Sequence, residues 1–204
     1  MKNSEIRGRL SKITVWKRGG QRAPHKPLLA LYVLGRYLRR DERLISYADV
    51  DRDLRELLIE FGPQRQSYHP DYPFWRLQND GVWELSNAER LDVPKGKDAK
   101  KTDLLRYDVH GGFKKEIYHK VIKDKVLLAG ITKDLLEANF PSTIHEDILQ
   151  AVGLDVDIET TTTIKRSPLF REKVLRAYEY CCAVCGFNVR VGNSLVALEA
   201  AHIK

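Results

Sequence analysis

Three residues near the end of this 204-residue chain have the chemistry of a metal site. Cys182 and Cys185 form a C-x2-C pair, and two thiolates at this spacing can supply half of a tetrahedral zinc site. His202 follows further along, and a histidine can accept a proton as a general base or bind a metal ion. The simpler alternative is that both cysteines are ordinary buried thiols, with Cys181 a core residue.

A second group of residues brings aromatic rings, prolines and cations together in the middle of the chain. Its rings and prolines are Tyr68, His69, Pro70, Tyr72, Pro73 and Phe74. Its cationic or titratable members are Arg76, directly downstream, and the earlier Arg22, His25 and Lys26. The simpler interpretation is a proline-stiffened loop packed over the core, with His25 opening a helix and Arg76 merely exposed.

The positive charge of the chain is concentrated in its first part. The chain carries 35 Lys and Arg against 28 Asp and Glu, a formal net charge of +7. Residues 1–40 hold eleven cations and one acid, residues 90–125 eleven cations and six acids, and residues 134–159 seven acids and no cation. Cations that meet phosphates release counterions, so the pattern favours a nucleic-acid partner. A solvated cationic surface is the alternative.

The composition excludes several other classes of protein. With 43% hydrophobic residues the chain can bury a core, which excludes wholesale disorder. No apolar run approaches the roughly 20 residues that span a bilayer, and the N-terminus lacks the apolar segment of a secretory signal. The three cysteines lie within five positions, which indicates a reduced compartment, expected to be the cytoplasm.

The periodicity of apolar residues predicts a mainly α (α+β) fold. Residues 28–39 are apolar on most faces and predict a central core helix, with Pro27 in its first turn. Ser46 and Asp49 predict a capping box for a helix that Gly62 ends. Residues 74–77 and 82–85 flank an Asn-Asp-Gly turn and predict a β-hairpin, hence a winged-helix-like arrangement. Further helices are expected at residues 5–15, 102–107, 114–128, 133–139 and 145–152.

The remaining segments indicate how the domains are divided. Basic loops are expected at residues 16–22 and 93–101, an irregular stretch at 64–73, and a helix separator at 110–112. Residues 155–166 contain four consecutive threonines and predict a linker. The chain therefore divides into a domain at 1–154 and a second domain at 167–204, which opens on a helix behind Ser167 and Pro168.

The second domain resembles the start of an HNH nuclease, in which a helix, a CxxCG knuckle, a strand and a buried "AHI" follow one another. The resemblance implies a ββα-metal fold. It gives His202 the role of the general base that takes a proton from the attacking water. It gives Cys182 and Cys185 the role of structural zinc ligands, completed by a second cysteine pair.

This sequence departs from the HNH pattern because it stops at Lys204. The second cysteine pair and the later metal-binding histidines are absent from it. We therefore expect this polypeptide to bind DNA without cutting it and to hold no cofactor. In the full-length parent we expect structural zinc, a catalytic divalent metal such as Mg or Mn, and a possible homodimer.

Two segments of the first domain, RAPHKPLLALYVLG (22–35) and YHPDYPFWRL (68–77), carry a second resemblance. Followed by the HNH start, they resemble the sulfur-binding domain of McrA-like type IV restriction endonucleases. That family binds phosphorothioate DNA, in which sulfur replaces one non-bridging backbone oxygen. The resemblance covers about residues 1–155, and it implies binding of modified double-stranded DNA with no role for a membrane.

The resemblance assigns roles to the candidate residues. A dry cavity of tyrosine and proline costs a phosphate oxygen its hydration and favours the less hydrated sulfur. Tyr72 and Pro73 best match the family's Tyr-Pro pair, with Tyr68, His69, Pro70 and Phe74 as further walls. The cationic groups are Arg22, His25, Lys26 and Arg76. The family's late basic loop matches Lys95, Lys97, Lys100 and Lys101.

Base reading in the major groove needs Arg or polar side chains, for which Gln64, Arg65, Gln66, Ser67 and Lys97 are candidates. Two other functions fit the same residues. One is a non-catalytic winged-helix regulator with a degenerate zinc knuckle. The other is an HNH nuclease that reads 5-methylcytosine, which needs an aromatic cage for a flipped base.

Overall fold

The computed structural model describes residues 2–13, 15, 17–18, 21–22, 24–39, 42–63 and 65–154 of the first part of the chain. Beyond these it describes residues 177–178, 181, 185–186, 189–191 and 194–196. The chain divides into two compact units, residues 1–158 and 159–204. The linker at 155–166, the helix expected behind Ser167, and the positions of Cys182 and His202 lie outside the described residues.

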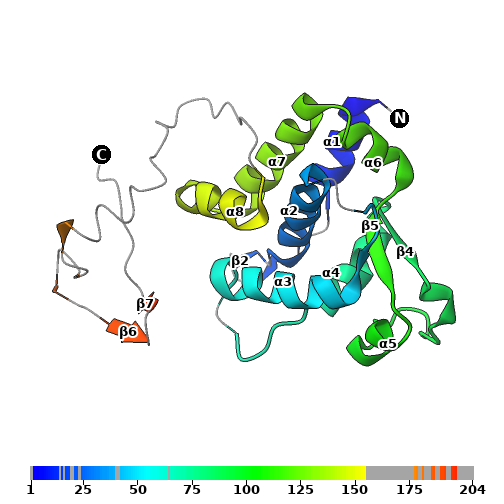
Figure 1. Ribbon diagram of the computed structural model, residues 1–204, viewed down its shortest axis with the longest axis horizontal. Coiled ribbons are helices and arrows are strands. Elements are labelled where there is room, and N and C mark those ends of the chain that lie inside the picture. The colour runs from blue at the N-terminus through cyan, green and yellow to red at the C-terminus, as the bar shows by residue number, and fades with distance from the viewer. Residues whose placement is uncertain are drawn as a thin grey trace. The chain divides into compact units, whose positions relative to one another are not determined.

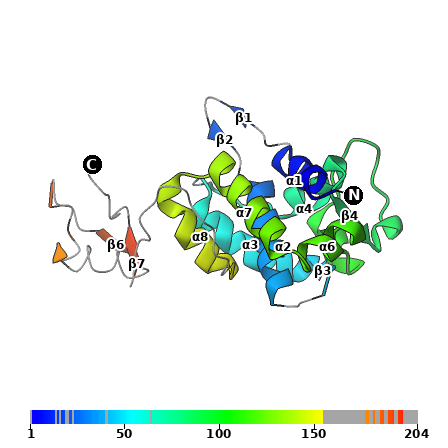
Figure 2. The ribbon, with the colours of Figure 1, turned by 90° about the horizontal axis from the view of Figure 1, so that it is seen from above.

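Helix α2 (His25–Leu38) is the centre of the first unit, as predicted. Every residue from Pro27 to Gly35 is buried, so the helix is covered on all sides. Helices α3 (Tyr47–Phe61), α4 (Asp71–Arg76), α7 (Lys125–Asn139) and α8 (His145–Val152) contact it (Figures 1 and 2). The helix begins three residues before the predicted start, which keeps Pro27 in its first turn, where a missing N–H is tolerated.

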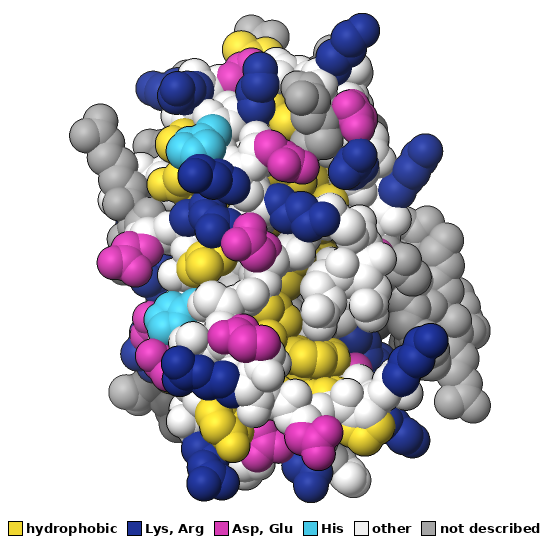
Figure 3. All heavy atoms as spheres, turned by 90° about the vertical axis from the view of Figure 1, so that its right-hand side faces the viewer, with side chains coloured by type: hydrophobic (Ala, Val, Ile, Leu, Met, Phe, Trp, Pro, Cys, Tyr) yellow, Lys and Arg dark blue, Asp and Glu magenta, His cyan; other side chains and the backbone are white. Residues whose placement is uncertain are grey.

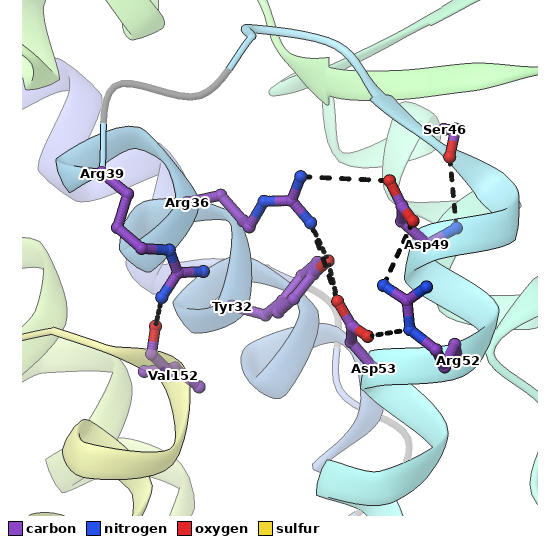
Figure 4. Close-up of polar contacts among 8 residues, drawn as sticks. All are labelled: Tyr32, Arg36, Arg39, Ser46, Asp49, Arg52, Asp53 and Val152. Carbon is purple, nitrogen blue, oxygen red and sulfur yellow. Dashed lines mark hydrogen bonds and ion pairs between the residues drawn. The ribbon is translucent and has the colours of Figure 1, made fainter.

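A polar network joins α2 to α3 (Figure 4). The hydroxyl of Tyr32 donates to Asp53 at 2.7 Å, and Arg36 donates to the Tyr32 oxygen at 2.8 Å. The predicted cap is confirmed, since the Ser46 hydroxyl accepts from the Asp49 amide at 3.2 Å. Gly62 ends α3, also as predicted. These contacts fix the orientation of α3 against the core helix.

Helices α1 (Asn3–Ser11), α6 (Lys115–Val121) and α7 differ from the prediction in their boundaries. Helix α1 packs on α7, burying Ile6 and Leu10. The single helix predicted for residues 114–128 is wrong, because the chain forms α6 and then starts α7. Asp124 separates them, and its side chain caps α7 by accepting from the Leu127 amide at 2.9 Å.

A three-stranded antiparallel sheet lies beside the helices, with β5 (His110–Phe113) between β3 (Ile45–Ser46) and β4 (Trp83–Ser86). The expectation that residues 110–112 only separate helices is therefore wrong. The glycines mark close packing in a strand. A Cβ on Gly112 would lie 2.0 Å from the carbonyl oxygen of Arg43, and one on Gly111 would lie 2.7 Å from the Trp83 ring.

The predicted hairpin at residues 74–85 is also wrong. Its first strand is helical: Phe74 lies in α4, and Leu77 opens a 3-10 turn, η1 (Leu77–Asp80). Phe74 and Leu77 are completely buried three positions apart, which is a helical spacing. Only Trp83–Ser86 is extended, and it pairs with β5. The winged-helix-like arrangement was predicted from this hairpin, which the described residues 74–85 do not form. The arrangement itself stays an untested prediction.

Short elements complete the described chain. The predicted loop at 16–22 contains a small antiparallel pair, β1 (Lys17–Arg18) and β2 (Gln21–Arg22). Helix α5 (Lys101–Arg106) and the 3-10 turns η2 (Ala88–Arg90) and η3 (Ser142–Ile144) follow in the first unit. In the second unit β6 (Val189–Val191) pairs with β7 (Ser194–Val196). None of the described helices is long and apolar enough to cross a membrane.

The packing of Gly112 gives a test of the sheet. We expect Gly112→Ala to reduce the free energy of unfolding by about 1–3 kcal/mol, because the new methyl group collides with backbone. Gly8, in α1, is the matched control: nothing lies within 4 Å of its Cβ position. Gly8→Ala should stabilise the protein by about 0.5–1 kcal/mol through helix propensity. Urea unfolding measures both, and equal effects would contradict this account of the strand.

Candidate nucleic-acid interface

Helix α4 presents Tyr72 on the surface. The helix buries Pro73 and Phe74, while Tyr72 remains 41% exposed. The His69 ring stacks on the Tyr72 ring, with centroids 4.9 Å apart and an interplanar angle of 17°. The Arg76 guanidinium lies over the same ring, 4.8 Å from its centroid. The structure therefore brings Tyr72 and Arg76 of α4 together with His69, which lies just before the helix, as one stack.

The loop after η2 is fixed to this stack. Arg76 Nε donates to Asp98 Oδ1 at 2.7 Å, and Arg76 Nη2 donates to Oδ2. The Arg76 charge lowers the pKa of the Asp98 carboxyl, mainly through this hydrogen bond. Next to Asp98, Ala99 is only 2% exposed, so the loop has an apolar anchor as well as an ionic one. The predicted basic loop is thus ordered around Asp98.

The loop carries its lysines on a tight turn. The Lys97 amide donates to the Pro94 carbonyl at 3.0 Å, and Gly96 has a φ of 80°. A positive φ at the third residue is typical of a type II turn and favours glycine. The turn leaves Lys95 and Lys97 exposed. These two ammonium groups therefore project from a defined backbone.

A groove of about 410 Å³ lies between this turn and the end of α4. Trp75, Arg76, Gln78 and Asn79 line one side, and residues 93–98 line the other. Gln78 donates to the Trp75 carbonyl at 2.7 Å, which fixes its amide. The prediction did not include Gln78, Asn79 or Asp98. Asp98 could have been noticed as the single acid among the lysines of residues 93–101.

A second cluster surrounds the start of α2. Burial lowers the pKa of His25, and the positive charges of Arg65 and His69 lower it further. The Tyr68 hydroxyl accepts from the Arg65 amide at 3.4 Å, while Ser67 Oγ lies 3.0 Å from His69 Nε2. Arg65 and His69, distant from His25 in sequence, thus influence its charge, while a single site formed by these residues stays a prediction.

Asp71 is the buried acid beneath this cluster. Its side chain is 9% exposed, and burial raises the pKa of its carboxyl. Its Oδ1 has no hydrogen-bond partner among the described residues but lies 3.7 Å from His69 Nδ1. Asp71 therefore places a buried carboxyl group beside the ring that stacks on Tyr72.

Two predicted DNA-binding lysines form ion pairs within the domain. Lys26 Nζ lies 2.5 Å from Asp80, and their side chains are only 14% and 6% exposed. Lys101 Nζ lies 2.6 Å from Asp51, which also accepts from Arg55 at 3.0 Å. Lys100, by contrast, is exposed at the start of α5. Lys26 and Lys101 thus connect elements of the domain.

Several predicted site residues cannot be placed in the interface. Gln64 lies outside the described residues, as do Cys182 and His202, and Arg22 is described only as part of β2. Gln66 is exposed, and Pro70 is buried before α4. Cys185 is exposed, and the described residues contain no group of three His, Cys, Asp or Glu able to hold a metal. The zinc site stays a prediction.

Charges of both signs are mixed on the face that carries β4, α5 and α6. Figure 3 shows Lys and Arg side chains there separated by Asp and Glu. No broad surface of a single sign covers this face. On this face, attraction to DNA would therefore depend on particular exposed groups, and the overall charge of the chain is a poor guide to it.

The fold is shared with DNA-recognition domains of known structure. The sulfur-binding domain of ScoMcrA, complexed with phosphorothioated DNA, has a TM-score of 0.64 at 22% identity over 72% of this chain and 94% of that one. The sulfur-binding domain of SprMcrA, also complexed with phosphorothioated DNA, has a TM-score of 0.63 at 19% identity over 76% and 95% of the two chains.

The sequence identifies the family. The family model of the ScoMcrA-like DNA sulfur-binding domain matches residues 3–157, and the chain belongs to this family. The type IV phosphorothioation-dependent restriction endonuclease ScoMcrA also shares the fold, with a TM-score of 0.54 at 22% identity. The match covers 72% of this chain but 28% of that enzyme. No curated protein sequence matches this chain.

The burial of Lys26 predicts a structural effect. We expect Lys26→Ala to cost about 1–3 kcal/mol in the free energy of unfolding, because the Asp80 carboxylate then loses a mostly buried ion-pair partner. Replacing both partners, with Lys26→Met and Asp80→Leu, should cost less. Denaturant unfolding checks both. A stable Lys26→Ala protein with weakened DNA binding would instead support a direct contact between Lys26 and DNA.

Proposed function

We propose that residues 3–157 of this chain bind double-stranded DNA at a phosphorothioate linkage. The match to the DNA sulfur-binding domain family carries this proposal. The fold supports it, since two solved structures with the same fold are sulfur-binding domains in complex with phosphorothioated DNA. The exposed His69–Tyr72–Arg76 stack supplies the type of surface that such a ligand needs.

Replacing a phosphate oxygen by sulfur leaves the charge of the linkage unchanged, so long-range electrostatics cannot select it. Selection has to come from contact with the sulfur itself, which is larger and less hydrated than oxygen. Tyr72 and the His69 ring stacked on it offer apolar area at a low cost in side-chain entropy, since their mutual contact already holds them. The exposed Lys95 and Lys97 contribute attraction that does not depend on the modification.

We further propose that this domain directs an HNH endonuclease to modified DNA. The sequence of residues 167–204 supports this with its cysteine pair and His202. In that enzyme Cys182 and Cys185 would hold structural zinc, and His202 would act as the base beside a divalent metal ion. ScoMcrA, a restriction endonuclease that shares the fold of the domain, is consistent with such an assembly.

The proposed sulfur contact predicts a preference that depends on Tyr72. Gel shift or fluorescence anisotropy on duplexes that differ by one sulfur should show tighter binding of the modified duplex. Tyr72→Ala should reduce the preference by about tenfold, equivalent to ~1.4 kcal/mol of lost sulfur contact. Tyr178, 55% exposed in the second unit, is the matched control, and Tyr178→Ala should leave the preference unchanged.

Two outcomes would count against this proposal. Equal affinity of the unaltered protein for both duplexes would remove the sulfur-binding function altogether. A preference that survives in Tyr72→Ala would move the contact to the Tyr68–Pro70 segment. A duplex carrying 5-methylcytosine serves as a third arm, and tighter binding to it than to the sulfur duplex would favour the alternative nuclease.

The basic turn predicts a different response. Lys95→Ala and Lys97→Ala should each weaken modified and unmodified duplexes equally. The slope of log affinity against log salt is negative, and each substitution should make it less steep by about 0.9, the value for one lost phosphate contact. Lys101→Ala should change the slope less than either turn variant, because Lys101 is paired with Asp51. An unchanged slope in both turn variants would exclude the turn from the interface.

A further inference from the structure

The Asp98 carboxylate binds the Arg76 guanidinium in the way that a phosphate group would. Two nitrogens of Arg76, Nε and Nη2, each donate to a separate oxygen of Asp98, the first at 2.7 Å. This fork-shaped geometry is the one by which arginine recognises either carboxylate or phosphate. The Arg76 side chain is 51% exposed and Asp98 is 25% exposed, so solvent and ligands can reach the pair.

The pair lies where the two proposed parts of the interface meet. Arg76 contacts the Tyr72 ring, and Asp98 follows directly after the turn that carries Lys95 and Lys97. Both members of the pair line the groove between α4 and the turn. A DNA backbone that reached Tyr72 and the turn together would therefore pass the Arg76 guanidinium.

We infer that Asp98 limits the affinity of the domain for ordinary DNA by competing with phosphates for Arg76. A phosphate must displace Asp98 to use that guanidinium, and the carboxylate also repels the backbone. Affinity for any duplex is thereby lowered, and only a duplex that adds the sulfur contact is held firmly. The inference rests on the proposed function, because it requires this surface to face DNA.

The test is the affinity of Asp98→Asn for an unmodified duplex, measured by fluorescence anisotropy over a series of salt concentrations. The substitution keeps the shape and removes the charge, so Arg76 becomes free to bind a phosphate. We expect the salt dependence of the affinity to become steeper by about 0.9. The affinity at physiological salt should rise about fivefold, the gain from one added phosphate contact. An unchanged or weaker affinity would overturn the inference.

Asp92 provides the control for net charge. It is an exposed acid on the same loop, and the described residues give it no ion pair with Arg76. Asp92→Asn removes one negative charge without freeing a guanidinium, so its salt slope should stay near that of the unaltered protein. Equal effects of Asp92→Asn and Asp98→Asn would show a simple charge effect and contradict the inference.

A double variant protects the test against misfolding. Arg76→Gln combined with Asp98→Asn removes both charges and leaves neither unpaired. Its affinity for the unmodified duplex should lack the gain expected of Asp98→Asn, since Arg76 is the proposed phosphate ligand. A double variant as tight as Asp98→Asn alone would exclude Arg76. Circular dichroism confirms that each variant is folded.

These outcomes are separable from the proposed function. Failure of the unaltered protein to prefer the sulfur duplex would remove the sulfur proposal. The difference in salt slope between Asp98→Asn and Asp92→Asn on unmodified DNA would still decide whether Asp98 competes for Arg76.

Discussion

The burial of residues 27–35 of α2 on every side is the constraint on which the rest of the domain depends. A helix that is apolar on every face must be covered on every side, and α3, α4, α7 and α8 share that task. Gly35 permits the close approach of α8, because a Cβ there would lie 1.9 Å from the Val152 carbonyl oxygen. Covering α2 also brings its first residue, His25, near Arg65 and His69, so the proposed interface is a consequence of core packing.

The internal use of cations changes the meaning of the net charge. Arg7 pairs with Asp134 between α1 and α7, Arg43 with Glu84 beside the sheet, and Lys26 with Asp80 next to α4. These groups connect segments that are far apart in sequence. They contribute little to the attraction of a polyanion, because a carboxylate already neutralises each one. Exposed lysines on ordered loops are the more relevant group for DNA binding.

The sequence allowed a good prediction of the buried helix, of the caps at Ser46 and Gly62, and of the family. These features depend on local periodicity and on single capping residues. The role of Gly111 and Gly112 could not be predicted in this way, because it arises from Trp83 and from the Arg43 backbone, which only the folded chain brings there. The segment at 74–77 was misassigned because the aromatic residues Phe74 and Trp75 favour strands locally, whereas burial of Phe74 and Leu77 against the core decides for a helix.

The candidate site also could be predicted only in part from local sequence patterns. Residue types identified the region around Tyr72, but no local pattern separates Arg76, which is paired at the surface, from Lys97, which is exposed on the turn. That difference depends on Asp98, whose position is set by the packing of Ala99 and by the type II turn.

Selection of sulfur over oxygen places a particular demand on rigidity. The two linkages carry the same charge and differ by one atom. A surface that adapts its shape to both would bind them equally well and would not select sulfur over oxygen. Helix α4 has only six residues and is too short to be stable alone. The burial of Pro73 and Phe74 holds it, while the contacts of His69 and Arg76 hold the Tyr72 ring. The proposed discrimination at the exposed Tyr72 ring would therefore depend on the hydrophobic core beneath it, and a core substitution beneath α4 would weaken selectivity before it weakened general attraction to DNA.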